Sequence, residues 1–309
     1  MSSVNYVLER AEALIQGLGS PASMTELLRY PLNKAAAHLQ SNRHWPVIEL
    51  PLLLGTEFAL SPRVSTDLAI ANLLLYGFAD ITDDAQDGDL PEQISWQRAV
   101  NAGNLLSFLG SKVLLGMPLE ASLINRLASA YAAAGQLMTH GQELDLLATY
   151  PHVPTIEAYF DAIAKKSGAS AAFFAQAAAI AAGHSEHCVQ DLGDFGRSLG
   201  AYIQILSDLE GYDGNVSSDF KNLKVTLPLL FGLASSEGET IRAHLEQGSA
   251  GDLAEALRRL GAPAYCRMRA ELLRRRANKA LSRVPISGPT RAALMDYLES
   301  ASKPASLYL

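Results

Sequence analysis

The stretch LLLYGFADITDDAQDGD, residues 73–89, joins an apolar helix to a row of acids. The aspartates at 80, 83, 84 and 87 are spaced i, i+3, i+4 and i+7, so they share one helix face. Like charges in such a row repel each other, and Asp is a mediocre helix former. A solvated acidic helix end leading into the Gly88 turn is one interpretation. Because a divalent cation would offset both costs, and hard oxygen ligands suit Mg²⁺ better than zinc, we favour a magnesium site.

Helical periodicity extends over almost the whole chain, and alternating strand-like runs are nearly absent. The sequence therefore predicts an all-α fold of roughly ten to thirteen helices. No low-complexity linker or repeat divides the chain, so we expect residues 1–309 to form a single domain, one large helical bundle. Five stretches are apolar around their circumference, which is typical of core helices. These central helices are expected near residues 66–87, 95–117, 120–148, 155–183 and 189–213.

Composition narrows the possible functions. The 309 residues include 25 Lys and Arg against 32 Asp and Glu, and the net charge of -7 argues against nucleic acid as a partner. Two widely separated cysteines fit a reducing compartment, with the cytoplasm as the default location. The amino terminus shows no pattern of a secretory signal, and the uncharged run 167–184 is too weakly apolar to predict a transmembrane segment.

A second polar site follows another apolar helix. Gln204 and Asp208 are spaced i, i+4 on one face, and the loop beyond them carries acids and lysines, including Lys224. Two buried helices that deliver carboxylates to one rim, with lysines beside them, would let Mg²⁺ bridge a ligand diphosphate while the lysines neutralise its outer oxygens.

Together these residues resemble the trans-isoprenyl diphosphate synthases, the polyprenyl synthetase family of the all-α isoprenoid synthase fold. The resemblance implies a helical bundle around a central active-site cavity, Mg²⁺ as cofactor and a homodimer. Its motifs are DDxxD at 83–87, a small-residue helix at 95–106, GQxxD at 141–145, the K-T/S element at Lys166 and Ser167, the FQ position at Gln204, and KxTLP at 224–228.

The resemblance also implies residue roles. It places Mg²⁺ ligation at Asp83, Asp84 and Asp87, with Asp208 near an opposite metal, and diphosphate contacts at Lys166 and Lys224. Catalysis would rest on Asp83, Asp84, Lys166 and Lys224, and the substrate-binding positions would be Arg43, Phe78, Gln142, Gln204, Lys166 and Lys224. The reaction begins when diphosphate leaves an allylic carbon, and metals and lysines stabilise the charge that develops. The double bond of isopentenyl diphosphate then attacks the cation.

Several positions depart from the family pattern. The second aspartate-rich motif reads SDLEG at 207–211 and keeps one carboxylate, Asp208. On the isopentenyl diphosphate side, the family's basic stretch aligns with NRHWP at 42–46, where only Arg43 remains, and Leu75 replaces a histidine. The double arginine expected after the first motif is missing from residues 88–97.

Three hypotheses follow. The first is a Mg²⁺-dependent short-chain prenyltransferase that joins an allylic diphosphate to isopentenyl diphosphate. The second is a terpene-synthase-like lyase, or a prenyltransferase with another acceptor, which needs only the allylic site. The third is a non-catalytic subunit of an active synthase, which the eroded second motif favours.

Phe78 offers a prediction of chain length. In short-chain synthases, which this segment resembles, a bulky side chain five residues before the first aspartate stops the growing tail, although Phe78 is equally well interpreted as an ordinary core residue. Five residues span about 7.5 Å of helix, which places Phe78 below the metals. With an aromatic residue at this position and no insertion in the DDxxD motif, the resemblance implies a product or substrate of about C15 to C20.

Two other features carry less information. The tract HSEHC at 184–188 lacks the second ligand cluster of a structural zinc site. The arginines at 267, 269 and 274–276 are most simply a solvated helix face, although they could close over a diphosphate or contact a partner.

Overall fold

The computed structural model describes residues 3–40, 45–212 and 217–300. Apart from one isolated β-bridge, the regular elements in these residues are helices, which confirms the all-α prediction. The described part of the chain has fifteen helices, more than the ten to thirteen expected, because short connecting helices such as α2, α10 and α11 have no clear periodicity. The helices are α1 (Ser3–Gln16), α2 (Ala22–Leu28), α3 (Tyr30–Gln40), α4 (Pro46–Glu57), α5 (Pro62–Asp87), α6 (Trp96–Leu115), α7 (Ala121–Leu147), α8 (Ile156–Ala181), α9 (Glu186–Glu210), α10 (Ser218–Lys221), α11 (Leu227–Leu233), α12 (Gly238–Glu246), α13 (Ala250–Leu260), α14 (Ala262–Leu281) and α15 (Gly288–Ser300).

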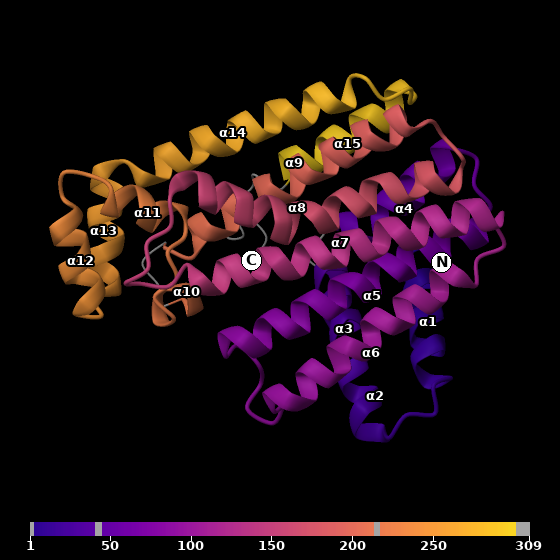
Figure 1. Ribbon diagram of the computed structural model, residues 1–309, viewed down its shortest axis with the longest axis horizontal. Coiled ribbons are helices and arrows are strands. Elements are labelled where there is room, and N and C mark those ends of the chain that lie inside the picture. Colours follow the sequence, from indigo (N-terminus) through magenta and orange to yellow (C-terminus); the bar gives the residue numbers. More distant parts are fainter. Residues whose placement is uncertain (1–2, 41–44, 213–216, 301–309) are drawn as a thin grey trace.

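The long helices run side by side along the longest dimension of the molecule (Figure 1). Helix α8 packs between α7 and α9, α5 packs against α4 and α6, and α14 covers α9. The short helices α10 to α13 gather at one end of the bundle (Figure 1). Apolar side chains from these layers form a common buried cluster, so the polar end of each long helix is fixed by packing along its whole length.

Helix α5 is delimited by ordinary local signals. The Ser61 hydroxyl caps its first turn by accepting a hydrogen bond from the Val64 N–H at 3.3 Å, and Pro62 occupies the first helical position. Gly88 ends the helix in the left-handed region at φ 76°. The acidic row therefore lies on the last turns of a helix that is otherwise buried in the core.

The expectation that all five central helices are buried on every side is wrong for α6 and α7. Only five of the 27 residues of α7 are buried, and α6 exposes 72% of Phe108 and 59% of Leu115. In α7 much of the apolar character comes from Ala, whose small surface leaves little hydrophobic driving force for burial. In α6 the Ala and Gly residues face the core, and the large residues Phe108 and Leu115 lie on the outer face. These helices cover one flank of the bundle with their outer faces open.

Helix α5 is also long and apolar enough to cross a membrane by length and composition alone, with a mean hydropathy of 1.3 in its most apolar window. That window is 78% buried inside the protein. The apolar surface of α5 is therefore already covered by neighbouring helices, as in the core helix of a globular bundle.

Two glycines bring the neighbours of α8 unusually close to it. A Cβ on Gly141 of α7 would lie 2.2 Å from the backbone nitrogen of Lys166. A Cβ on Gly200 of α9 would lie 2.2 Å from the carbonyl oxygen of Ser167. Both approaches occur at the same turn of α8, so the spacing of three helices at this level depends on glycine.

We expect Gly141→Ala to destabilise the protein by about 1–3 kcal/mol, because the methyl group meets backbone and forces α7 away from α8. Gly135→Ala on the same helix is the matched control, since a Cβ at this position would meet no atom within 4 Å other than those of the adjacent backbone of α7. That change should stabilise the protein by up to about 1 kcal/mol through helix propensity. Urea unfolding of both variants measures the difference, and equal unfolding midpoints would contradict the close approach.

Candidate active site

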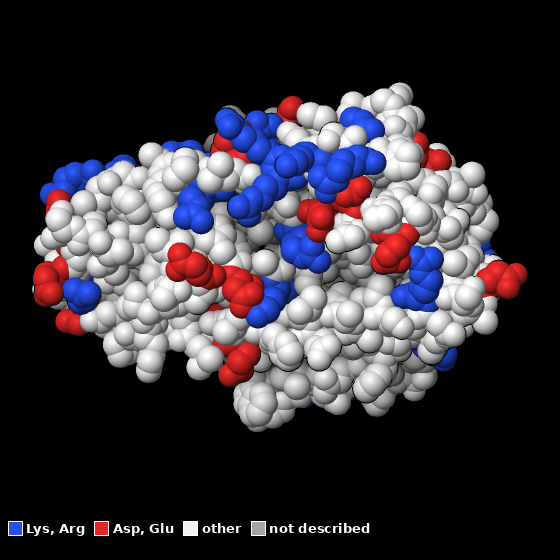
Figure 2. All heavy atoms as spheres, turned by 45° about the horizontal axis from the view of Figure 1, so that its top comes forward, with Lys and Arg blue, Asp and Glu red and all other residues white. Residues whose placement is uncertain are grey.

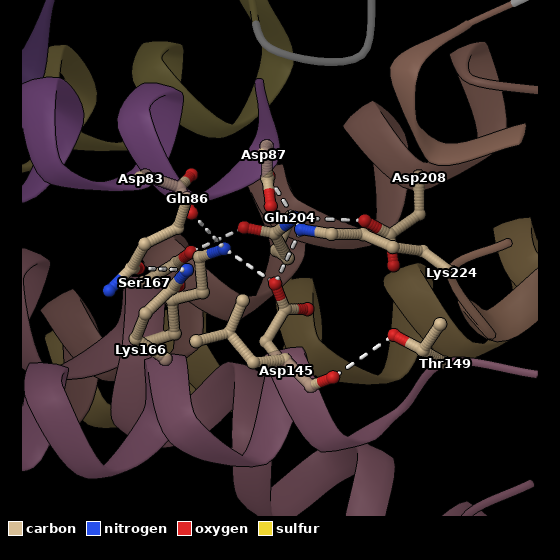
Figure 3. Close-up of polar contacts among 12 residues, drawn as sticks. Asp83, Gln86, Asp87, Asp145, Thr149, Lys166, Ser167, Gln204, Asp208 and Lys224 are labelled. Atoms are coloured by element: carbon tan, nitrogen blue, oxygen red, sulfur yellow. Dashed lines mark hydrogen bonds and ion pairs between the residues drawn. The ribbon is translucent and has the colours of Figure 1, made fainter. Parts of the chain in front are cut away.

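Acids and lysines from α5, α7, α8 and the α10–α11 loop point toward one another in one cluster (Figure 3). The Lys166 ammonium group on α8 donates to Asp83 Oδ1 at 2.9 Å and to Asp145 Oδ2 at 2.8 Å. Asp145 lies on α7, so one lysine bridges the first acidic motif and the GQxxD motif. The close approach of α7 to α8 at Gly141 makes this bridge possible.

Lys224 completes the cluster from the opposite side. Its ammonium group donates to Asp87 Oδ2 at 2.6 Å and to Asp145 Oδ2 at 2.9 Å, and only 7% of its side chain is exposed. The backbone of this loop is held by an isolated bridge to Thr149, and the Tyr212 hydroxyl donates to the Lys224 carbonyl oxygen at 2.8 Å. Lys224 is therefore positioned by its own backbone as well as by its ion pairs.

The charges in this cluster depend on one another. Burial raises the pKa of Asp87, although Lys224 acts against this shift. Burial acts in the same direction on Asp145, but Lys166 and Lys224 outweigh it and lower the pKa of that carboxyl. Burial by itself would lower the pKa of Lys224, but Asp145 and Asp87 raise it. The lysines therefore favour the charged forms of the two carboxylates, and the carboxylates favour the charged forms of the lysines.

Asp84 faces a different set of partners. Lys34 of α3 donates to Asp84 Oδ2 at 2.9 Å and forms an ion pair with Asp80 Oδ2 at 2.8 Å. The hydroxyl of Tyr30 donates to the same Asp84 oxygen. Lys34 and Tyr30 carry no recognisable sequence motif, so sequence analysis missed them. The acidic row of α5 is thus divided between two lysine-containing groups.

We call the acidic row of α5 the first wall of the site, and Gln204 and Asp208 of α9 the second wall. Asp208 is 4% exposed and accepts from the Tyr159 hydroxyl at 2.5 Å and from Gln204 Nε2 at 2.8 Å. Gln204 in turn accepts from the Ser167 hydroxyl at 2.5 Å. Burial raises the pKa of Asp208 to about 7, despite these two hydrogen bonds. Asp208 therefore joins the site through Gln204 and Ser167 rather than through the lysines (Figure 3).

An additional acid lies beside this wall. A Cβ on Gly211, the last position of the degenerate second motif, would lie 3.0 Å from Asp219 Oδ2. Burial raises the pKa of Asp219, and Lys224 acts against this shift. In the sequence, Asp219 is one of the acids in the loop beyond Gln204 and Asp208. Its carboxylate lies next to the space that the third motif side chain would need.

Two other expected site residues, Gln142 and Phe78, lie near the acidic row of α5. Gln142 Nε2 donates to Gln86 Oε1 at 2.9 Å across the gap between α7 and α5. Phe78 is partly buried and lines a pocket of about 320 Å³ between α5, α6 and α7, with Leu75, Tyr131 and Thr139 among its neighbours. Arg43 lies outside the described residues.

The donor set fits a hard divalent cation in chemistry, because it offers carboxylate oxygens on successive helical turns. Within residues 3–40, 45–212 and 217–300, no three His, Cys, Asp or Glu side chains converge on one point as they would around a metal. Ammonium groups lie between the carboxylates instead. A cation here would share the acids with Lys166 and Lys224 and would take other ligands from water or phosphate. Asp145 contacts both lysines. From the sequence it was only the last residue of the GQxxD motif, with no role in the site.

The family model for polyprenyl synthetase matches residues 91–260, more than half of the chain. The chain therefore belongs to the polyprenyl synthetase family. It is 32% identical to the octaprenyl diphosphate synthase of Escherichia coli (strain K12) over 176 residues, 52% of this chain and 54% of that protein. The chain thus spans about half the length of that relative. It is 28% identical to a short chain isoprenyl diphosphate synthase of Methanothermobacter thermautotrophicus over 238 residues, 70% of this chain and 73% of that protein.

Solved structures share the fold over nearly the whole chain. The geranylgeranyl pyrophosphate synthetase from the archaeon Geoglobus acetivorans superposes with a TM-score of 0.79 at 22% identity, covering 97% of this chain and 98% of that one. A polyprenyl synthase from Caulobacter crescentus CB15, complexed with calcium and isoprenyl diphosphate, superposes with a TM-score of 0.76 at 19% identity, covering 98% of each chain. These matches confirm the all-α isoprenoid synthase fold.

Proposed function

We propose that the protein is a Mg²⁺-dependent short-chain prenyltransferase that condenses an allylic diphosphate with isopentenyl diphosphate. One observation carries this proposal: Asp83, Asp87 and Asp145 converge on Lys166 and Lys224 at the mouth of a bundle of this family. The Caulobacter relative, which was solved with calcium and isoprenyl diphosphate, supports a divalent cation and a prenyl diphosphate as ligands.

The side chains have distinct tasks in this proposal. Asp83, Asp84 and Asp87 would hold Mg²⁺, Asp145 would position Lys166 and Lys224, and Asp208 and Asp219 would form a weaker second wall. Bound Mg²⁺ stabilises negative charge on the leaving diphosphate. Lys166 and Lys224 exchange their carboxylate partners for diphosphate oxygens and stabilise the same charge. Apolar side chains below them, including Phe78, exclude water from the allylic cation.

A lyase that uses only the allylic site is the second candidate. Leu75 is fully buried and lines the apolar pocket, so it offers no charge where the family pattern has a histidine. Lys34 favours the synthase instead, because it places a cation beside Asp84 where an acceptor diphosphate can bind. The two candidates differ in whether isopentenyl diphosphate is consumed.

Incubation with dimethylallyl, geranyl, farnesyl or geranylgeranyl diphosphate and Mg²⁺, each with and without isopentenyl diphosphate, tests the proposal. Longer prenyl diphosphates that form only when isopentenyl diphosphate is present are the expected result. Hydrocarbon or alcohol products without isopentenyl diphosphate would identify a lyase. No product and no released diphosphate in any reaction would favour a non-catalytic subunit.

Phe78→Ala is expected to lengthen the product beyond the proposed C15 to C20 range, because the pocket between α5 and α7 would become deeper. Since Phe78 is only partly buried, the loss of stability should be smaller than the roughly 3–5 kcal/mol typical of a core Phe→Ala change. Phe195→Ala is the control, because Phe195 is fully buried on α9 away from the pocket. It should cost the full amount and leave product length unchanged. Chromatography of the products at equal folded concentration decides between a pocket floor and ordinary core.

A homodimer would cover the open flank of α6 and α7, where Phe108 and Leu115 are exposed beside the pocket. We therefore expect Phe108→Ser combined with Leu115→Ser to shift the protein from dimer to monomer in sedimentation velocity. Exposed Tyr6 of α1 supplies the control change Tyr6→Ser, which should leave the dimer intact. A monomeric parent protein would contradict this assignment.

We also propose a cytoplasmic location, and the buried free cysteines Cys188 and Cys266 fit such a reducing compartment.

A further inference from the structure

Basic side chains gather on the outer face of α14, although the chain as a whole has a net charge of -7. This helix carries six basic residues and one acid, Glu271. Figure 2 shows Lys and Arg gathered along the edge of the molecule that α14 forms. We call this surface the α14 face; its basic members are Arg267, Arg269, Arg274, Arg275, Arg276 and Lys279.

Several of these cations are not neutralised by carboxylates in the described part of the protein. Glu271 pairs with both Arg274 and Arg275, so it compensates at most one of these two charges. In the part of the chain that the structure describes, Arg267, Arg276 and Lys279 are exposed and form no ion pair. An acidic protein thus keeps a cluster of available cations on one helix.

Two large apolar side chains lie within the basic cluster. Met268 is 48% exposed and Leu272 is 45% exposed. They are four residues apart, and Arg276 follows after four more, so the three side chains form one row along the helix. Arg267 and Arg275 lie beside this row. The α14 face therefore combines an apolar centre with basic edges.

We propose that the α14 face binds the surface of a membrane that contains anionic lipids. Basic residues would lie at the level of the lipid headgroups, while Met268 and Leu272 enter the boundary with the acyl chains. A nucleic acid or an acidic protein would match the charge but would leave two exposed apolar side chains without a role at the centre of the contact. Because α14 also packs on α9 through its buried side, it can bind at its outer face without leaving the bundle.

Helix α14 is linked to the candidate active site through two aromatic residues of α8. The Arg269 guanidinium group lies 4.0 Å from the ring centroid of Phe160 on α8. The ring of Tyr159, next in sequence, contacts Phe160 edge to face, and its hydroxyl donates to Asp208. The bound helix would thus hold the second wall of the site close to the lipid surface. Membrane binding itself does not depend on the proposed activity, so each can fail without the other.

Co-sedimentation of the full chain with vesicles tests the proposal. We compare vesicles of phosphatidylcholine alone with vesicles of phosphatidylcholine and phosphatidylglycerol in equal parts. The expected result is binding only to the anionic vesicles and release at about 1 M salt, where the Debye length falls to about 3 Å. Each basic residue near such a surface contributes about a factor of five in affinity, so Arg267→Gln, Arg276→Gln and Lys279→Gln together should weaken binding by about 100-fold.

The controls separate charge, apolar insertion and folding. Arg242→Gln, Arg258→Gln and Arg259→Gln together remove the same charge from α12 and α13, where each arginine already pairs with a glutamate, and should leave binding unchanged. Met268→Ser with Leu272→Ser keeps every charge and should weaken binding at least several-fold. Circular dichroism melts confirm that each variant is folded. Failure of the parent protein to bind, equal losses in both triple variants, or no effect of the apolar pair would overturn the proposal.

Discussion

Asp83→Asn is expected to lower kcat/KM by about 10²–10³-fold while the protein stays folded. The change removes a carboxylate that would hold Mg²⁺ and that directly contacts Lys166. Its effect on stability should be within about 1 kcal/mol, because 33% of the Asp83 side chain is exposed and Lys166 keeps its second partner, Asp145. Steady-state kinetics with the best allylic substrate and thermal melts measure both effects.

Asp89→Asn supplies the matched control, because Asp89 is exposed and lies two residues beyond the acidic motif. The charge change is identical, so a general electrostatic effect would appear equally in both variants. We expect Asp89→Asn to retain the parent activity. Near-normal turnover by Asp83→Asn would remove the basis for a metal site on α5.

Lys224→Met should cost about 3–5 kcal/mol of folding free energy and also abolish activity. The large effect on stability follows from burial: Lys224 is 7% exposed and pairs with Asp87, whose side chain is 13% exposed, and with Asp145. Removal of the ammonium group leaves Asp87 without its ion-pair partner in a place where water reaches it poorly. Urea unfolding at neutral pH without metal measures the loss.

The comparison variant is Lys221→Met, because Lys221 is exposed three residues earlier. We expect this variant to have the same urea midpoint of unfolding as the parent protein and to remain active. If the two lysine variants were equally stable, the buried ion pairs of Lys224 would not be part of the folded protein in solution.

The acidic row of α5 could be predicted because its spacing along one helix fixes the face on which the aspartates lie. Lys166 and Lys224 were inferred from their motifs alone, since Lys224 lies in the α10–α11 loop, where spacing fixes no face. Asp83, Asp87, Lys166 and Lys224 are in contact, as their motifs suggested. The acidic row was expected to need a cation to offset its repulsion. The structure shows that lysines already do this, with Lys34 serving Asp80 and Asp84.

Features that depend on the packing of distant segments could not be predicted from the sequence. Lys34 reaches α5 across about fifty residues of intervening chain. Asp145 meets two lysines because Gly141 lets α7 approach α8, and a single motif gives no measure of that distance. The burial of α7 was overestimated because its Ala-rich composition counts as apolar without requiring a fully enclosed position. The burial of α6 was overestimated because composition alone does not show that Phe108 and Leu115 lie on its open face.

The central claim is that the cluster formed by Asp83, Asp87, Asp145, Lys166 and Lys224 binds an allylic diphosphate together with a divalent cation. A crystal structure of the protein with Mn²⁺ and a non-hydrolysable thiolo analogue of geranyl diphosphate tests it most directly. We predict anomalous density for Mn²⁺ against the α5 carboxylates and the diphosphate within hydrogen-bonding distance of both lysine ammonium groups, with the prenyl tail directed toward Phe78. Mn²⁺ absent from these acids, with Lys166 and Lys224 still paired to Asp83, Asp87 and Asp145 and the analogue bound elsewhere, would contradict the claim.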